Sequence, residues 1–111
     1  MNLQTRIENN VTVLTVSGRL DTVTAPEYEK NIREMISGGN IKFVVDFEQL
    51  EYISSAGLRG LLIMAKLLNE KGGRMCLANV KGNVRSVFDM CGFTAVFTMK
   101  DSVSEALAVF V

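Results

Sequence analysis

Two adjacent serines, Ser54 and Ser55, stand where a strand-like segment runs into a helix-like one. The residues before them, 41–47, are apolar, β-branched and aromatic, which is typical of a buried strand in a parallel sheet. Apolar residues after them recur at helical spacing from Leu58 onward. A serine at this junction can cap the helix by accepting a hydrogen bond from the amide of Gly57 or Leu58. Its hydroxyl would also lie at the positive end of the helix dipole, which favours a phosphate group, so the pair is a candidate acceptor site for a kinase.

Two aspartates and one arginine could take part in chemistry with this serine pair. Asp21 and Asp46 each follow a predicted strand, so we expect both at the edge of the sheet where the helix begins. An aspartate after a strand commonly accepts hydrogen bonds from its own turn, and for Asp46 that role and a supporting role at the site both stay open. Arg59, in the first turn of the helix, could contact a phosphate or a partner, or could simply be solvated.

Three small residues, Ala56, Gly57 and Gly60, fall on one side of the start of this helix. The segment 57–60 could be taken for part of a phosphate-binding loop. However, the chain contains neither GxxxxGK followed by Ser or Thr nor a GxGxxG after a strand. We therefore favour a close approach of the helix to the sheet, or of a partner to the helix, over a ligand pocket.

The composition argues against several kinds of function. The 111 residues include no histidine, which removes the commonest general base, the Ser-His-Asp arrangement and most zinc sites. Twelve basic and twelve acidic side chains give a formal net charge of zero, so nothing suggests the basic surface that nucleic-acid binding needs. The cysteines, Cys76 and Cys91, have no CxxC partner and are expected to be buried thiols. We expect a non-enzymatic protein that uses no metal or cofactor.

Length and hydropathy predict one compact domain that spans residues 1–111. The first six residues contain no apolar signal core, and no apolar run approaches the length needed to span a bilayer. We therefore expect a cytoplasmic protein with no direct membrane insertion.

Periodicity and turn signals predict alternating strands and helices. Strands at 5–8 and 11–17 flank the turn dipeptide Asn9-Asn10 and should form an antiparallel hairpin. Thr24 and Glu27 have the spacing of a capping box for the next helix. The later elements are a strand from Ile41, a helix from Ser55 to Gly72, a strand at 74–78, a helix at 83–90, a strand at 95–99 and a last helix capped by Asp101 or Ser102.

This order of elements predicts an α/β fold. The opening hairpin and the later crossovers indicate a mixed sheet, antiparallel at first and then parallel, flanked by about four helices.

Four short motifs carry a resemblance to a known family through their order and spacing. They are Gly18-Arg19-Leu20-Asp21 after a strand, Asp46 at the end of another, Ser54-Ser55-Ala56-Gly57-Leu58, and Val87-Phe88-Asp89-Met90-Cys91-Gly92-Phe93. With these motifs the chain resembles the STAS domains, named for sulfate transporters and anti-sigma factor antagonists, and within them the stand-alone bacterial anti-sigma factor antagonists. The resemblance covers nearly the whole chain and implies a single STAS domain.

The resemblance also implies roles for individual residues. In the family, the serine two residues before the helix-opening glycine is phosphorylated by an anti-sigma factor that is itself a serine kinase, and here that serine is Ser55. Many phosphorylated members have an acidic residue where this chain has Ser54, which is the alternative acceptor, and some have a second hydroxyl in place of Ala56. The aspartate matching Asp21 lies close to the phosphoacceptor. The residues expected to bind the partner are Asp21, Ser54, Ala56, Gly57, Leu58 and Arg59, supported by Asp46.

The implied function is partner switching. An unphosphorylated anti-sigma factor antagonist captures a kinase of histidine-kinase-like ATPase fold and frees a sigma factor or equivalent effector, and a phosphoserine phosphatase would restore it. One alternative is a soluble STAS accessory subunit of a membrane lipid-transport system, a group that usually lacks the serine in a Ser-Ala-Gly-Leu context. A small nucleotide-binding protein or enzyme is a third reading. A neighbouring gene for such an ATPase would favour the first, and genes for an ABC transporter the second.

Overall fold

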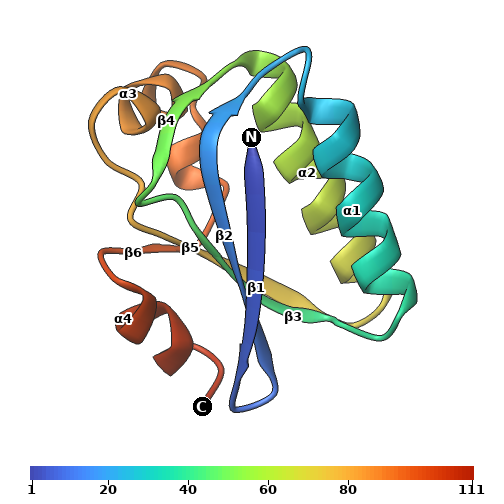
Figure 1. Cartoon of the computed structure of the whole chain (residues 1–111). Coiled ribbons are helices and arrows are strands. Elements are labelled where there is room, and N and C mark those ends of the chain that lie inside the picture. Colours follow the sequence, from blue (N-terminus) through green and yellow to red (C-terminus); the bar gives the residue numbers. More distant parts are fainter.

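The computed structural model describes all 111 residues and is built on a mixed sheet (Figure 1). Its strands are β1 (Asn2–Glu8), β2 (Val11–Leu20), β3 (Lys42–Asp46), β4 (Leu50–Ile53), β5 (Arg74–Ala78) and β6 (Met99–Lys100). They run in the order β1-β2-β3-β5-β6, and β4 pairs with β2. Only the β1–β2 pair is antiparallel, and the turn between them places Asn9 and Asn10 at φ 51° and 67°, as a tight hairpin requires. The predicted hairpin followed by parallel strands is confirmed.

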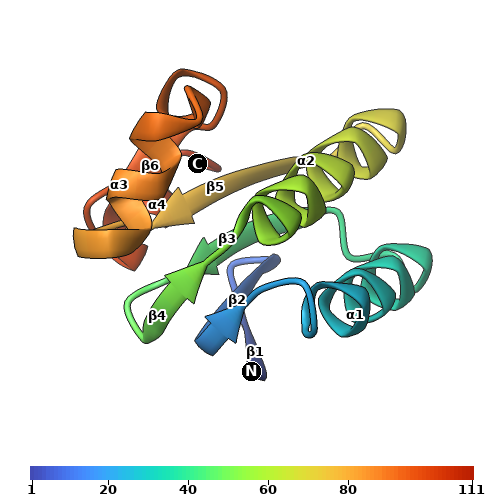
Figure 2. The same cartoon turned by 90° about the horizontal axis from the view of Figure 1, so that it is seen from above.

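Four α-helices complete the domain, as predicted: α1 (Ala25–Ser37), α2 (Ser55–Glu70), α3 (Gly82–Met90) and α4 (Val103–Ala108). Helices α1 and α2 pack against each other along one face of the sheet, while α4 packs on β3 and β5 from the other side (Figures 1 and 2). Helix α3 lies beside β4. None of the helices combines the length and apolar character that crossing a membrane requires.

Side chains of the central strands alternate between two hydrophobic clusters. Because successive residues of a strand point to opposite faces, each strand supplies both. The larger cluster, under α1 and α2, includes Leu14, Val45 and Leu77. The smaller one, under α4, includes Val13, Val44, Cys76 and Ala106. Burial on both faces explains why these strands are continuously apolar in sequence.

Strand β4 is absent from the sequence-based prediction, which passes from one strand at 41–47 directly to the helix at Ser55. Strand β2 pairs with β3 up to Thr15 and with β4 from Gly18 (φ +86°), and the register of the β2–β4 pair shifts directly after Gly18. Only Leu50 and Ile53 of the four β4 residues are buried, so the segment is too short to show a periodic pattern. It brings the chain to the start of α2.

Two further predictions are wrong near the C-terminus. The expected strand at 95–99 is reduced to β6, because the 3₁₀ helix η1 (Phe93–Ala95) precedes it. The Phe97 ring packs edge-on against both Phe93 and Phe88, with ring centroids 6.1 Å apart in each pair, and this cluster favours a compact turn over an extended chain. Cys91, expected to be buried, is exposed because it lies just beyond the last turn of α3.

The predicted capping box of α1 does not form. The Thr24 hydroxyl donates to the carbonyl of Arg19 at 2.9 Å and accepts from the amide of Asp21 at 2.9 Å, so it binds the preceding loop and not the helix. Thr24 precedes α1 without a side-chain cap bond.

The start of α2 lies directly against the end of β2. The Ser54 amide donates to the carbonyl of Leu20 at 3.0 Å, and the Ser54 hydroxyl accepts from the amide of Gly57 at 3.3 Å, which caps the helix. A Cβ atom on Gly57 would lie 2.6 Å from the Leu20 carbonyl oxygen. The predicted close approach of helix to sheet is therefore confirmed at Gly57. Gly60 instead faces α1, where a Cβ would meet Tyr28 at an ordinary 3.5 Å.

These contacts predict opposite effects for two glycine-to-alanine substitutions in one helix. Gly57→Ala should lower the free energy of unfolding by about 1–3 kcal/mol, because the new methyl group must displace backbone of β2. Gly60→Ala should be neutral or raise it by up to about 1 kcal/mol, since alanine is the better helix former and its methyl group would make only an ordinary contact with Tyr28. Urea unfolding of both variants measures this, and a Gly57→Ala protein as stable as the wild type would contradict the packing.

The cap predicts unequal effects for the two serines. Ser54→Ala should cost about 1 kcal/mol of unfolding free energy, because the Gly57 amide loses its acceptor. Ser55→Ala should change stability by less than about 0.5 kcal/mol, as is usual for exposed positions. Thermal melts of both variants under one buffer condition make the comparison, and a larger loss for Ser55→Ala would mean that Ser55 is the cap.

Candidate functional site

Ser55 is the serine whose hydroxyl is available for chemistry. It is exposed as the first residue of α2, and its Oγ makes no hydrogen bond within the protein. Ser54 is only half-buried, but its Oγ is occupied by the cap. With no histidine in the chain, no imidazole can activate the Ser55 hydroxyl as a nucleophile.

Asp21 closes the loop that leads from β2 to α1. Its Oδ1 accepts hydrogen bonds from the amides of Val23 at 3.0 Å and Thr24 at 3.1 Å. These bonds, that from Thr24 foremost, hold the pKa of Asp21 below its usual value, so the group is ionised at neutral pH. Asp21 directly follows Leu20, the residue that binds the Ser54 amide, and this loop therefore flanks the start of α2.

Arg19 and Tyr52 form a second feature beside this loop, which the sequence did not reveal. They are register partners on β2 and β4, the Arg19 guanidinium lies 4.3 Å from the centre of the Tyr52 ring, and its Nε is 3.4 Å from Asp21 Oδ2. Arginine over an aromatic face is attracted by the ring quadrupole. Only the pairing of β4 with β2 brings the two together, so no local pattern could have found them. Val23, which is 85% exposed, projects from the same loop.

The structure does not bring Asp46, expected as a supporting residue, together with the serines. Its register partner on β2 is Thr15, whereas that of Ile53, the residue before the serine pair, is Leu20. Five residues of strand separate the two levels by roughly 16 Å. Asp46 instead accepts a hydrogen bond from the Asn79 side chain at 2.9 Å, which joins the ends of β3 and β5, and one from the Glu48 amide at 3.1 Å, which closes its own turn.

The predicted partner-binding residues divide into two groups. Asp21, Ser54 and Ala56 are half-buried and Arg59 is exposed, so these four reach the surface around Ser55. Gly57 and Leu58 are buried, and Leu58 packs in the main core at 1% exposure. The prediction that Gly57 and Leu58 contact a partner is therefore not supported, and both have a structural role.

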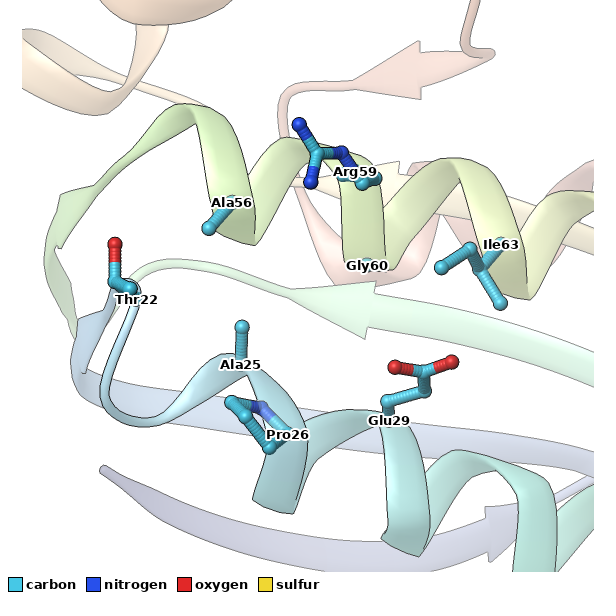
Figure 3. Close-up of a pocket in the computed structure, with 8 residues that line it drawn as sticks. All are labelled: Thr22, Ala25, Pro26, Glu29, Ala56, Arg59, Gly60 and Ile63. Atoms are coloured by element: carbon cyan, nitrogen blue, oxygen red, sulfur yellow. The ribbon is translucent and has the colours of Figure 1, made fainter.

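A cleft of about 190 Å³ opens between the first turns of α1 and α2 (Figure 3). Two of the residues that α2 presents there, Ala56 and Gly60, are small and leave this space open, and Pro26 faces them from α1. Arg59 lines it on one side and Glu29 on the other. Glu29 is paired with Arg33 of its own helix at 2.9 Å. The cleft is small and open, suited to a side chain of a partner and too small for a nucleotide.

The amino-acid sequence matches a known protein family over most of its length. Residues 2–106 match the model of the STAS domain. The chain is 35% identical over 95 residues to BtrV of Bordetella bronchiseptica, whose name assigns it provisionally to the anti-sigma factor antagonists, and the match covers 86% of this chain and 82% of that protein. It is 31% identical over 110 residues to the anti-sigma F factor antagonist of Paenibacillus polymyxa, covering 96% of this chain and 94% of that protein.

Solved structures share the fold. An anti-sigma factor antagonist from Mycobacterium paratuberculosis superimposes with a TM-score of 0.87 at 24% identity, over 97% of this chain and 92% of that one. The Bacillus protein SpoIIAA in its phosphorylated form superimposes with a TM-score of 0.75 at 23% identity, over 99% of this chain and 100% of that one. With the family model and the two sequence relatives, this establishes that the chain belongs to the STAS domain family and, within it, to the anti-sigma factor antagonists.

Proposed function

We propose that this protein is a partner-switching regulator controlled by phosphorylation of Ser55. Unphosphorylated, it binds an anti-sigma factor serine kinase of histidine-kinase-like ATPase fold and so releases a sigma factor or an equivalent effector in the cytoplasm. The observation that carries the proposal is that Ser55 is exposed and free of hydrogen bonds while the neighbouring Ser54 is used as the helix cap.

The modification itself is a phosphoryl transfer from ATP. The Ser55 oxygen forms a bond to the γ-phosphorus, the bond from that phosphorus to the β-phosphate oxygen breaks, ADP leaves, and the hydroxyl proton is released. A phosphoserine phosphatase reverses the change by hydrolysis. The Bacillus protein SpoIIAA, which shares this fold, has been solved in a phosphorylated form, and this supports the proposed chemistry.

The switch works through charge and leaves the fold intact. Phosphorylation adds about −1.5 to −2 charge and three acceptor oxygens to a chain whose formal net charge is zero. The positive end of the α2 dipole favours that charge by about 0.3–1 kcal/mol, and the first turn of α2 contains no acidic side chain to oppose it. A partner surface that covers Ser55 must instead desolvate the charge, which costs several kcal/mol and lowers affinity by a thousandfold or more.

The acceptor assignment predicts a single labelled position. Incubation with the cognate anti-sigma factor kinase and ATP should add one phosphate to Ser55, because only that hydroxyl of the pair is free. Peptide mass spectrometry locates the phosphate. Ser54→Ala should still be labelled and Ser55→Ala should not. Phosphate confined to Ser54 would overturn the assignment, and no phosphate with the proven partner kinase would overturn the switch.

Charge at Ser55 should also control partner binding. Ser55→Ala should bind the kinase as tightly as the unmodified wild type, because the site stays small and uncharged. Ser55→Asp should bind at least tenfold more weakly, which corresponds to about 1.4 kcal/mol. Isothermal titration calorimetry measures both affinities.

Ser104→Asp is the matched control, because Ser104 is an exposed serine near the start of α4, on the other face of the sheet. It adds the same charge away from the site and should bind as the wild type does. Equal affinities for Ser55→Ala, Ser55→Asp and phosphorylated wild type would refute control by charge.

A further inference from the structure

Arg59 is the one arginine of six whose side chain makes no hydrogen bond, ion pair or cation–π contact with the rest of the protein. Arg6, Arg19, Arg33 and Arg85 each pair with a carboxylate. Arg74 donates to the carbonyl of Val109 at 3.3 Å and lies over the Phe110 ring. The guanidinium of Arg59 has five N–H donors, and no acceptor atom of the unmodified protein is hydrogen-bonded to any of them.

The position of Arg59 relates it directly to Ser55. The two residues are four apart on α2, so their Cβ atoms lie about 5–6 Å apart on the same face of the helix. Long side chains on a helix lean back toward its N-terminus. Figure 3 shows the Arg59 side chain extended in that direction, toward the end of α2 where Ala56 lies. Both Ser55 and Arg59 are exposed.

No carboxylate competes for Arg59. Glu29, which faces it across the cleft, is paired with Arg33 at 2.9 Å. Asp21 accepts hydrogen bonds from two amides of its own loop and forms an ion pair with Arg19. A new anion on Ser55 would therefore meet an unpaired guanidinium one helical turn away.

We infer that Arg59 binds the phosphate group of phosphorylated Ser55 within the same molecule, an inference that rests on the proposed function. Guanidinium and phosphate match in geometry and form charge-assisted hydrogen bonds that a lysine would form less well. The pairing gives phosphorylation two effects at once. It places an anion on the surface that binds the partner, and it withdraws a cation that the partner could otherwise contact.

The test uses protein in which phosphoserine is incorporated genetically at position 55, so that it does not depend on any kinase. The probe is the ³¹P chemical shift of that phosphoserine, titrated with pH to give its second pKa, ordinarily near 6. A nearby cation stabilises the dianion, so Arg59→Gln should raise this pKa by about 0.3 units relative to the phosphorylated wild type. Arg59→Lys, which keeps the charge without the planar fork, should give an intermediate value.

Lys66→Gln is the matched control. Lys66 is exposed on the same face of α2 but lies roughly 16 Å along the helix axis from Ser55, so its removal changes the net charge equally without touching the phosphate. It should leave the pKa where it is in the wild type. Equal pKa values in the wild type, Arg59→Gln and Arg59→Lys would overturn the inference, as would equal shifts for Arg59→Gln and Lys66→Gln. A kinase that fails to label Ser55 would overturn the proposed function and leave this result unaffected.

Discussion

The organisation of this protein depends on how closely the first turn of α2 approaches the end of β2. The Leu20 carbonyl accepts a hydrogen bond from the Ser54 amide. It also lies so close to the helix that no side chain fits at position 57. Residues two apart on a helix point roughly 200° away from each other, so burial of Gly57 against the strand directs Ser55 outward. The exposure of Ser55 is thus a consequence of a backbone contact, and the burial of Leu58 on the core side follows from the same constraint.

The polar residues around the junction divide the work between structure and chemistry. Ser54 caps the helix, Asp21 closes the loop before α1, and Thr24 binds that loop from the other end. Each of these side chains makes at least one hydrogen bond within the unmodified protein. The side chains of Ser55 and Arg59 make no hydrogen bond, and these are the two residues to which we assign the reversible phosphorylation and the binding of the phosphate. Such a division allows the charge of the surface to change without loss of any contact that holds the fold.

Much of the fold could be predicted from sequence, because the opening hairpin, four helices and the buried parallel strands have strong local patterns. Ser55 could be chosen over Ser54 only by resemblance, since both are serines at a helix start and the cap is decided by backbone geometry. Strand β4 could not be predicted, because its two buried residues are too few to form a recognisable hydrophobic pattern. The misplacement of Asp46 follows from that omission, since without β4 the end of β3 adjoins the serines in sequence. The Arg19–Tyr52 contact also depends on β4.

The two cysteines lie in opposite environments, and this makes the protein convenient to label. Cys76 is buried in β5, where desolvation raises the pKa of its thiol and keeps it in the unreactive protonated form. Cys91 is exposed beyond the last turn of α3. A maleimide dye added to the folded, unaltered chain therefore has one accessible attachment point, Cys91. This residue lies at the end of α3, a helix distinct from the one that begins at Ser55. Fluorescence anisotropy from that dye gives a direct readout of complex formation with no engineered cysteine.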